Sequence, residues 1–317
     1  VLANSSAGSV NIVATALLLV ITLLVVPIIS YFTGTSLGTL EWAALQSVCW
    51  VMLAAWITCF ALGELTGNVS QVDKVWSLLP VVYTWVVAAH GDFSPRLLLM
   101  AVLVTAWGAR LTYNFSRHGA YQLRFWTGHE DYRWQVLRQK PEFQPRWKWT
   151  LFNLGFISGY QKVLIMLMTL PTIVALQFSE TPLGWLDALA AALMVLMLLI
   201  ETVADQQQWQ YQSAKKALIE AGQPLTGNYA KGFLDTGLWA WSRHPNYFAE
   251  QGTWIAFYLF SVAASGQCLN WSASGCFLLM ILFRGSSNFS EEISAGKYPE
   301  YAAYQEAVPR FIPIRIR

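Results

Sequence analysis

The sequence predicts an all-α protein, a multi-pass transmembrane helical bundle of seven to eight spans. Hydrophobic residues make up 55% of the 317 residues and charged residues only 12%, which does not describe a water-solvated surface. Apolar runs recur along the chain, and several could cross the roughly 30 Å of a hydrocarbon core. Basic residues concentrate in alternate connections between these runs. We therefore expect an integral membrane protein of the bacterial inner membrane or the endoplasmic reticulum.

Eight apolar runs are the expected spans. Five are clear, at 10–32, 42–62, 97–115, 156–178 and 185–203. Three are shorter than the roughly 20 residues that a perpendicular span needs, at 75–89, 251–264 and 271–283. The last two are predicted to form a short hairpin if not all eight runs cross. The first run lacks the flanks of a cleaved signal peptide, which favours a first span.

Charge placement predicts the orientation. If all eight runs cross, the connections near 33–41, 90–96, 179–184 and 265–270 share one side, and Arg96 is their single basic residue. All the other lysines and arginines then lie opposite. The positive-inside rule places both termini and the hydrophilic segments 116–155 and 204–250 in the cytoplasm.

Several classes of protein are disfavoured. The net charge of +2 does not indicate nucleic-acid binding. The four cysteines form neither a CxxC pair nor a Cys/His cluster, so we expect no metal site and no disulfide scaffold. A transporter would place ionisable groups near mid-span and show paired halves, whereas here the polar residues gather on one face. The segment 117–149 mixes arginine, lysine and tryptophan, which favours a loop on the membrane surface over a substrate-binding role.

The densest polar cluster is the motif LWAWSRHPNYFAE at 238–250. Pro245 suits the first turn of a helix, with Ser242 or His244 near the cap. The free backbone N–H groups of that turn, beside Arg243, would form an anion site. Asn246 and Glu250 would share one face. An ordinary capped helix whose arginine binds lipid phosphate is the alternative interpretation.

Two acidic residues of the preceding helix join this cluster. Glu201 and Asp205 are four residues apart at its cytoplasmic end. We therefore expect four acidic or amide groups to converge near the cytoplasmic ends of these two helices. Such groups suit the hydroxyls and amides of a polar ligand better than lipid headgroups, which carboxylates would repel.

These motifs carry a family resemblance. The runs DTGLW (235–239), SRHPNY (242–247), Glu250 and the tail YPEY…VPRFIP (298–313) resemble the carboxyl-terminal domain of steroid 5α-reductases, especially a bacterial branch. NVSQVD (68–73), WGARL (107–111) and 201–205 extend the similarity. It covers a membrane domain at 65–317 with the cofactor pocket, whereas the helices of 1–64 lie outside it.

The resemblance implies a cytoplasm-facing NADPH pocket, a lipophilic substrate drawn from the membrane lipids, and a monomer. The implied cofactor-binding residues are Arg110, Asp205, Lys231, Arg243, His244, Asn246, Tyr247, Glu250 and Arg284, with Lys215 and Lys216 as further candidates. For Arg110 and Arg284 the alternative is snorkelling to the interface. The implied reaction is NADPH-dependent reduction of a conjugated C=C bond, in a 3-oxo-Δ4-steroid or another lipophilic enone.

The wider superfamily also includes isoprenylcysteine carboxyl methyltransferases, which use S-adenosylmethionine. Glu250 favours the reductases, because the Asn-x-x-x-Glu spacing from Asn246 resembles theirs, although Glu291-Glu292 is similar to the methyltransferases. The methyltransferase is therefore the alternative function.

The expected proton donor is incomplete. Steroid 5α-reductases use a glutamate and a tyrosine; Asp73 falls at the glutamate position, but the tyrosine position falls near Trp107. Tyr83 and Tyr113 are the substitute phenols. Asp73 would have to stay protonated to donate. Alternatively, Ser70 and Asp73 form a capping box that opens a helix.

Overall fold

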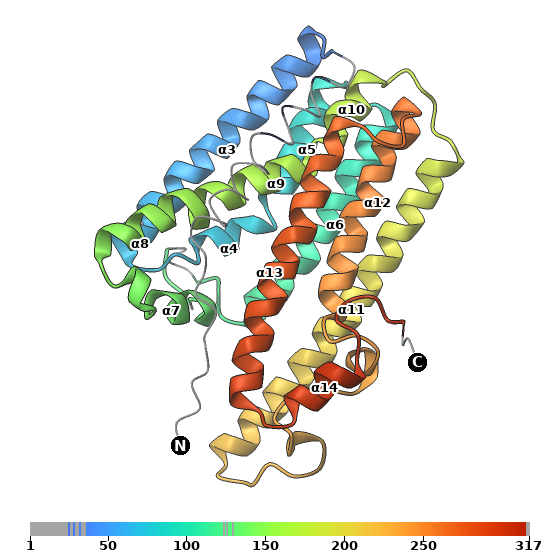
Figure 1. The fold of residues 1–317 in the computed structure, drawn as a ribbon. Coiled ribbons are helices and arrows are strands. Elements are labelled where there is room, and N and C mark those ends of the chain that lie inside the picture. Colours follow the sequence, from blue (N-terminus) through green and yellow to red (C-terminus); the bar gives the residue numbers. More distant parts are fainter. Residues whose placement is uncertain are drawn as a thin grey trace.

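The computed structural model describes residues 36–314, apart from positions 123, 125 and 129, together with Val25, Ile28 and Phe32. All regular structure in this part of the chain is helical, as predicted. The long helices run side by side in an elongated bundle (Figure 1). The first predicted span, 10–32, lies outside the described residues apart from those three positions.

The helices follow one another along the chain, with the two longest connections at 118–131 and 221–244. In chain order they are α3 (Thr39–Thr66), α4 (Gln71–Trp76), α5 (Leu79–His90), α6 (Pro95–Arg117), α7 (Tyr132–Arg138), α8 (Arg146–Phe152), the π-helix η3 (Asn153–Tyr160), α9 (Gln161–Thr169), α10 (Pro171–Gln177), α11 (Trp185–Glu220), α12 (Pro245–Ser265), α13 (Ser274–Lys297) and α14 (Tyr301–Ala307). Prolines start α6, α10 and α12, where the missing N–H is not needed.

Within the described residues, five helical stretches are long and apolar enough to cross a membrane. They are Thr39–Thr66, Gln71–His90, Pro95–Arg117, Arg146–Gln177 and Trp185–Glu220. These stretches indicate a membrane protein. The remaining two predicted runs of the described chain lie in α12 and α13, which are not among the five but pack within the bundle, α12 against α11 and α13 against α9.

One end of the bundle gathers the connections that the sequence placed together. The Arg96 guanidinium, at the start of α6, forms a 2.7 Å ion pair with Asp187 at the start of α11. It also donates to the carbonyls of Thr181 and Pro182, both at 3.0 Å. The Gln177 amide reaches the carbonyl of Ser36 at 2.8 Å. The connections 90–96 and 179–184 and the start of the described chain therefore meet at one end, as predicted.

The segment between α6 and α9 folds back on the bundle. Trp134 of α7 and Trp149 of α8 are buried, whereas Trp147 of α8 is 63% exposed. Trp134 and Trp149 pack with Cys59, Val69, Val72 and Ile157 in a cluster separate from the main core. The predicted surface loop is therefore anchored by two of its tryptophans.

Candidate functional site

A polar cluster lies where α6, α11 and α12 meet, and we call it the three-helix cluster: Trp107, Arg110, Asn114, Glu201, Asp205, Asn246, Glu250 and Thr253. Its centre is Arg110, whose guanidinium forms 2.7 Å ion pairs with both Glu201 and Asp205. Glu201 and Asp205 lie four residues apart on α11, so both carboxylates face α6. The expected convergence of acidic and amide groups is thus present.

The Glu250 carboxylate is held by two indoles. Trp107 of α6 donates to Oε2 at 2.7 Å and Trp254 of α12 donates to Oε1 at 3.0 Å. Both tryptophan side chains are fully buried. The position where the resemblance expected a tyrosine therefore carries a hydrogen-bond donor, but one that is already used on Glu250.

The amide groups complete the cluster. Asn246, in the first turn of α12, donates to Asp205 Oδ1 at 3.2 Å, and Asn114 of α6 donates to Asp205 Oδ2 at 2.9 Å. Asn246 reaches Asp205 of α11 and Glu250 reaches Trp107 of α6, so both side chains point into this cluster, as expected from their shared face. Among the described residues four buried polar atoms here have no hydrogen-bond partner, Arg110 Nε, Arg110 Nη2, Glu201 Oε2 and Thr253 Oγ1, although Arg110 Nη2 forms the ion pair with Glu201. Such orphans are rare in folded proteins, so they are the atoms with which a bound polar molecule would pair.

A second cluster joins the start of α12 to the carboxyl-terminal tail, and we call it the tail clamp: Arg243, His244, Glu291, Gln305 and Arg310. Glu291 of α13 accepts from Arg243 at 2.7 Å, from His244 at 2.9 Å and from Gln305 at 2.9 Å. The backbone N–H groups of Arg243 and His244 donate to the carbonyls of Pro309 and Arg310 at 2.9 and 3.0 Å.

Two residues predicted to bind the cofactor, Arg243 and His244, belong to the tail clamp. Arg243 is buried, and its guanidinium is used on Glu291 and on carbonyls of the tail. Burial raises the pKa of the Glu291 carboxyl, but hydrogen bonds from His244, Arg243 and Gln305 outweigh it and hold the pKa well below its usual range. The predicted cap position is borne out, since His244 is the N-cap residue of α12 and Pro245 follows it.

Arg310 of the tail clamp and the nearby Arg284 form a pair of basic residues, which we call the basic pair. Arg284 of α13 is exposed, and Arg310 is close enough for the two guanidiniums to repel each other. Burial lowers the pKa of Arg310, Glu291 acts against it, and Arg284 and Arg243 lower it further. Tyr247 stacks on His244 with ring centroids 5.1 Å apart. Sequence reasoning placed Arg284 here but assigned no role to Arg310.

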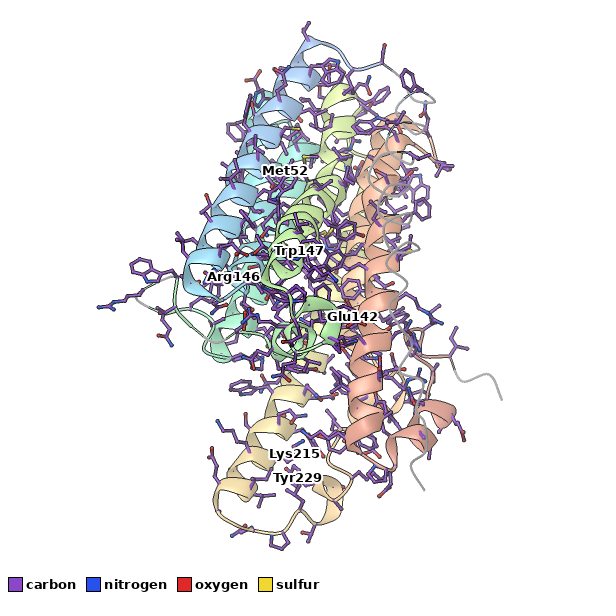
Figure 2. All side chains as sticks on the ribbon, turned by 60° about the vertical axis from the view of Figure 1, so that its left-hand side comes forward. Met52, Glu142, Arg146, Trp147, Lys215 and Tyr229 are labelled. Atoms are coloured by element: carbon purple, nitrogen blue, oxygen red, sulfur yellow. The ribbon has the colours of Figure 1, made fainter. Side chains whose placement is uncertain are left out.

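The other predicted lysines lie elsewhere. Lys215 is buried and donates to the carbonyl of Gly232 at 2.7 Å and to Tyr298 at 3.2 Å. Figure 2 places Lys215 and Tyr229 at the end of the molecule beyond the other long helices, far from Met52. Lys231 pairs with Asp235 at 2.6 Å, and Lys216 pairs with Glu220.

The three predicted catalytic residues make no hydrogen bond to one another in the described part of the chain. Asp73 of α4 accepts from the indole of Trp134 at 3.0 Å. Tyr83 of α5 is fully buried and its hydroxyl has no partner among the described residues. Tyr113 is 64% exposed, with the Arg117 guanidinium over its ring. Ser70 is the N-cap residue of α4, but its hydroxyl makes no cap hydrogen bond and accepts from the N–H of Asp131.

Sequence reasoning missed a buried charge. Lys162 of α9 is fully buried, although the run 156–178 was interpreted as an apolar span. A charged residue inside such a run was the signal that could have found it.

Over the described ranges, no group of three or more His, Cys, Asp or Glu side chains could hold a metal ion.

Comparison with known proteins adds a family. An uncharacterised protein of Schizosaccharomyces pombe is 40% identical in an alignment of 259 residues that covers 78% of this chain and 73% of the yeast protein. No solved structure matches. The family described as "Protein of unknown function (DUF1295)" matches residues 59–308, a range that contains the three-helix cluster and most of the tail clamp. The chain therefore belongs to the DUF1295 family.

Proposed function

We propose that the chain is an NADPH-dependent membrane reductase that reduces a conjugated C=C bond of a lipophilic enone, a 3-oxo-Δ4-steroid or a similar molecule. The observation that carries the proposal is the three-helix cluster. It combines a carboxylate fixed by two indoles with the unpartnered atoms Glu201 Oε2 and Thr253 Oγ1. The motifs shared with steroid 5α-reductases fall on the same residues, Asp205, Asn246 and Glu250.

The chemistry of the cluster fits one end of a dinucleotide. Three carboxylates face a single guanidinium, so the cluster suits hydroxyl and amide donors and repels phosphate. A ribose or a carboxamide supplies such donors. The phosphates would instead suit the basic pair of Arg284 and Arg310, whose mutual repulsion an anion relieves. When bound, NADPH would supply the hydride.

The chain's own residues would bind and orient. Trp107 and Trp254 would keep Glu250 in place, and Arg110 would hold Glu201 and Asp205 toward the cofactor. Such preorganised groups do not have to rearrange when the reaction occurs. Of the two predicted phenol donors, Tyr83 is buried and therefore suits a lipophilic substrate better than the exposed Tyr113. Asp73, Tyr83 and Tyr113 remain predictions as catalytic residues.

The membrane setting follows from charge. We propose seven to eight spans with both termini in the cytoplasm, so that the three-helix cluster faces the cytoplasmic side, where NADPH is available. Most basic residues lie in the matching connections, and Arg96 is the single one in the connections opposite, which supports this orientation. A lipophilic substrate would then enter from the bilayer.

One observation favours the alternative, an S-adenosylmethionine-dependent methyltransferase. The excess of carboxylates in the three-helix cluster would also attract a sulfonium cation. The two functions differ in the molecule that the purified protein retains.

The test is binding of both molecules to the full chain in lipid nanodiscs. We expect NADPH to bind, and Glu250→Gln to weaken it about tenfold, or about 1.4 kcal/mol. Glu220→Gln, on the exposed end of the same α11, is the matched control and should leave the affinity unchanged. Retention of S-adenosylmethionine without NADPH would overturn the reductase in favour of the methyltransferase.

A further inference from the structure

The least satisfied charge among the described residues of the membrane helices is Lys162. Its side chain is fully buried, and its ammonium has one hydrogen-bond acceptor, the carbonyl of Val72 at 3.3 Å. An ammonium carries three N–H donors, so two are left without an acceptor. An ionisable group inside a membrane span is costly, and such groups usually face a ligand or a partner.

Lys215 shows what a satisfied buried lysine looks like in the same chain. It is 8% exposed, donates two hydrogen bonds, and lies over the rings of Tyr211 and Tyr298. A structural role thus explains Lys215. No comparable set of contacts surrounds Lys162.

The groups around Lys162 define the kind of ligand that it could bind. Asp73 and Cys59 are the ionisable groups that interact electrostatically with it, and Asp73 is the only acid of the two. Asp131 and Arg133, the charged residues beyond Asp73, form a 2.7 Å ion pair with each other. The Asp73 carboxylate is therefore close enough to offset part of the charge of the ammonium, although the two groups form no direct ion pair. An ammonium with a carboxylate already nearby favours a neutral acceptor, such as a carbonyl oxygen, over a second carboxylate.

The surroundings are apolar and locally irregular. Val69, Val72, Trp134 and Ile157 pack as one buried cluster beside α4 and α9. The π-helix η3 ends at Tyr160, two residues before Lys162. Short π-helical segments are frequent at functional sites, because they break the regular packing of a helix. A lipophilic molecule with one polar atom matches this combination of apolar walls and a free donor.

We propose that Lys162 binds the carbonyl oxygen of a neutral lipophilic ketone, enone or aldehyde, with Asp73 as the balancing charge. The inference deepens the proposed function and rests on it for the identity of the substrate class. The ammonium would hydrogen-bond the oxygen on which negative charge develops as the conjugated bond is reduced, and it would keep its proton. Asp73 thereby becomes a positioning residue for Lys162 and is not itself the donor.

The test labels the native protein and needs neither NADPH nor turnover. The full chain in nanodiscs is treated with dodecanal and cyanoborohydride, and the modified lysines are mapped by peptide mass spectrometry. A labelled lysine first releases its proton to the buffer; the amine and the aldehyde then form an imine and water, and cyanoborohydride delivers the hydride that reduces the imine to a stable secondary amine. We expect a dodecyl group on Lys162 and none on Lys215. An unmodified Lys162, under conditions that label the exposed Lys216, would overturn the proposal.

Competition tests the ligand class. A neutral 3-oxo-Δ4-steroid should reduce labelling of Lys162 at least fivefold without changing that of Lys216, whereas the hydrocarbon hexadecane should protect neither. Equal protection by palmitate would contradict the preference for a neutral carbonyl. If NADPH does not bind, the proposed reductase function is wrong, but the labelling of Lys162 still supports a carbonyl-binding lysine. The reverse outcome, NADPH binding with an unreactive Lys162, would remove only the present inference.

Discussion

The indole N–H of Trp107 on α6 donates to Glu250 Oε2 on α12 over 2.7 Å, and the ring of Trp254 meets that of Trp107 nearly edge-on at 5.0 Å. The Trp254 indole donates to the other oxygen of the same carboxylate. Glu250 is therefore fixed between two helices before any ligand binds. Its orientation depends on residues outside the Asn-x-x-x-Glu spacing that first drew attention to it.

Trp107→Phe should keep the buried ring and remove the donor. A hydrogen bond to a charged group contributes about 1.5–3 kcal/mol, so we expect the free energy of unfolding to fall by about 2 kcal/mol. NADPH affinity should fall about tenfold, because Glu250 loses its orientation. Denaturant unfolding and NADPH titration in nanodiscs measure the two effects.

Trp85→Phe is the matched control, since the Trp85 indole donates to Thr105 at 2.9 Å away from the three-helix cluster. It should cost about 1 kcal/mol of stability and leave NADPH affinity unchanged. Wild-type NADPH affinity in Trp107→Phe would contradict the role given to Glu250.

Arg110→Met should leave Glu201 and Asp205 without their shared counter-charge. Removing one partner of a buried ion pair costs about 3–5 kcal/mol, because the remaining charges stay buried. Arg96→Met removes the equally close partner of Asp187 at the other end of α6 and α11. Both variants should lose similar stability by thermal unfolding, but only Arg110→Met should lose NADPH binding. Loss of binding in both would show that the effect is global.

The positions of the two ion pairs explain how far the sequence could predict the site. Arg96 and Asp187 lie near the starts of α6 and α11, and Arg110 and Glu201 each lie fourteen residues further along, from 96 to 110 and from 187 to 201. The two helices are therefore parallel and in register. The sequence predicted both helices and the shared end of their first connections, but the pairing itself depends on packing between distant segments.

The start of α12 was predictable because it is local. Pro245 fixes the backbone of the first turn, and four-residue spacing places Glu250 on the face of Asn246. The use of Arg243 was not predictable, because Glu291 reaches it from α13, 48 residues away in sequence. The π-helix before Lys162 likewise has no signature in an apolar run.

Acid should release the tail clamp. The folded-state pKa of Glu291 is lowered, so its contribution to stability is fully present above its unfolded pKa of about 4.3 and is lost as the pH falls below that value. We expect the tail after residue 298 to become progressively more sensitive to an acid-active protease as the pH is lowered from about 4 toward the depressed folded-state pKa of Glu291.

Glu291→Gln should show this sensitivity already at neutral pH and should flatten the pH profile. Glu292→Gln, at the exposed neighbouring position, should behave as wild type. Unchanged proteolysis of the Glu291→Gln tail at pH 7 would show that Glu291 does not hold it.

Gly108→Ala should force α5 and α6 apart. A Cβ atom at Gly108 would lie 2.6 Å from the backbone oxygen of Ser77 and from Cγ2 of Val81, closer than real Cβ atoms approach. The Ser77 carbonyl belongs to the backbone and cannot rotate away, so the helices must shift and strain the 2.6 Å hydrogen bond between the hydroxyls of Ser77 and Thr112. Overpacking of this kind costs about 1–3 kcal/mol.

Gly285→Ala in α13 is the matched control. A Cβ atom at this position meets nothing within 4 Å, so the substitution should stabilise the protein by up to about 1 kcal/mol through helix propensity. Thermal unfolding of the two variants should therefore move in opposite directions, and a Gly108→Ala protein as stable as Gly285→Ala would contradict the close approach of α6 to the α4–α5 connection.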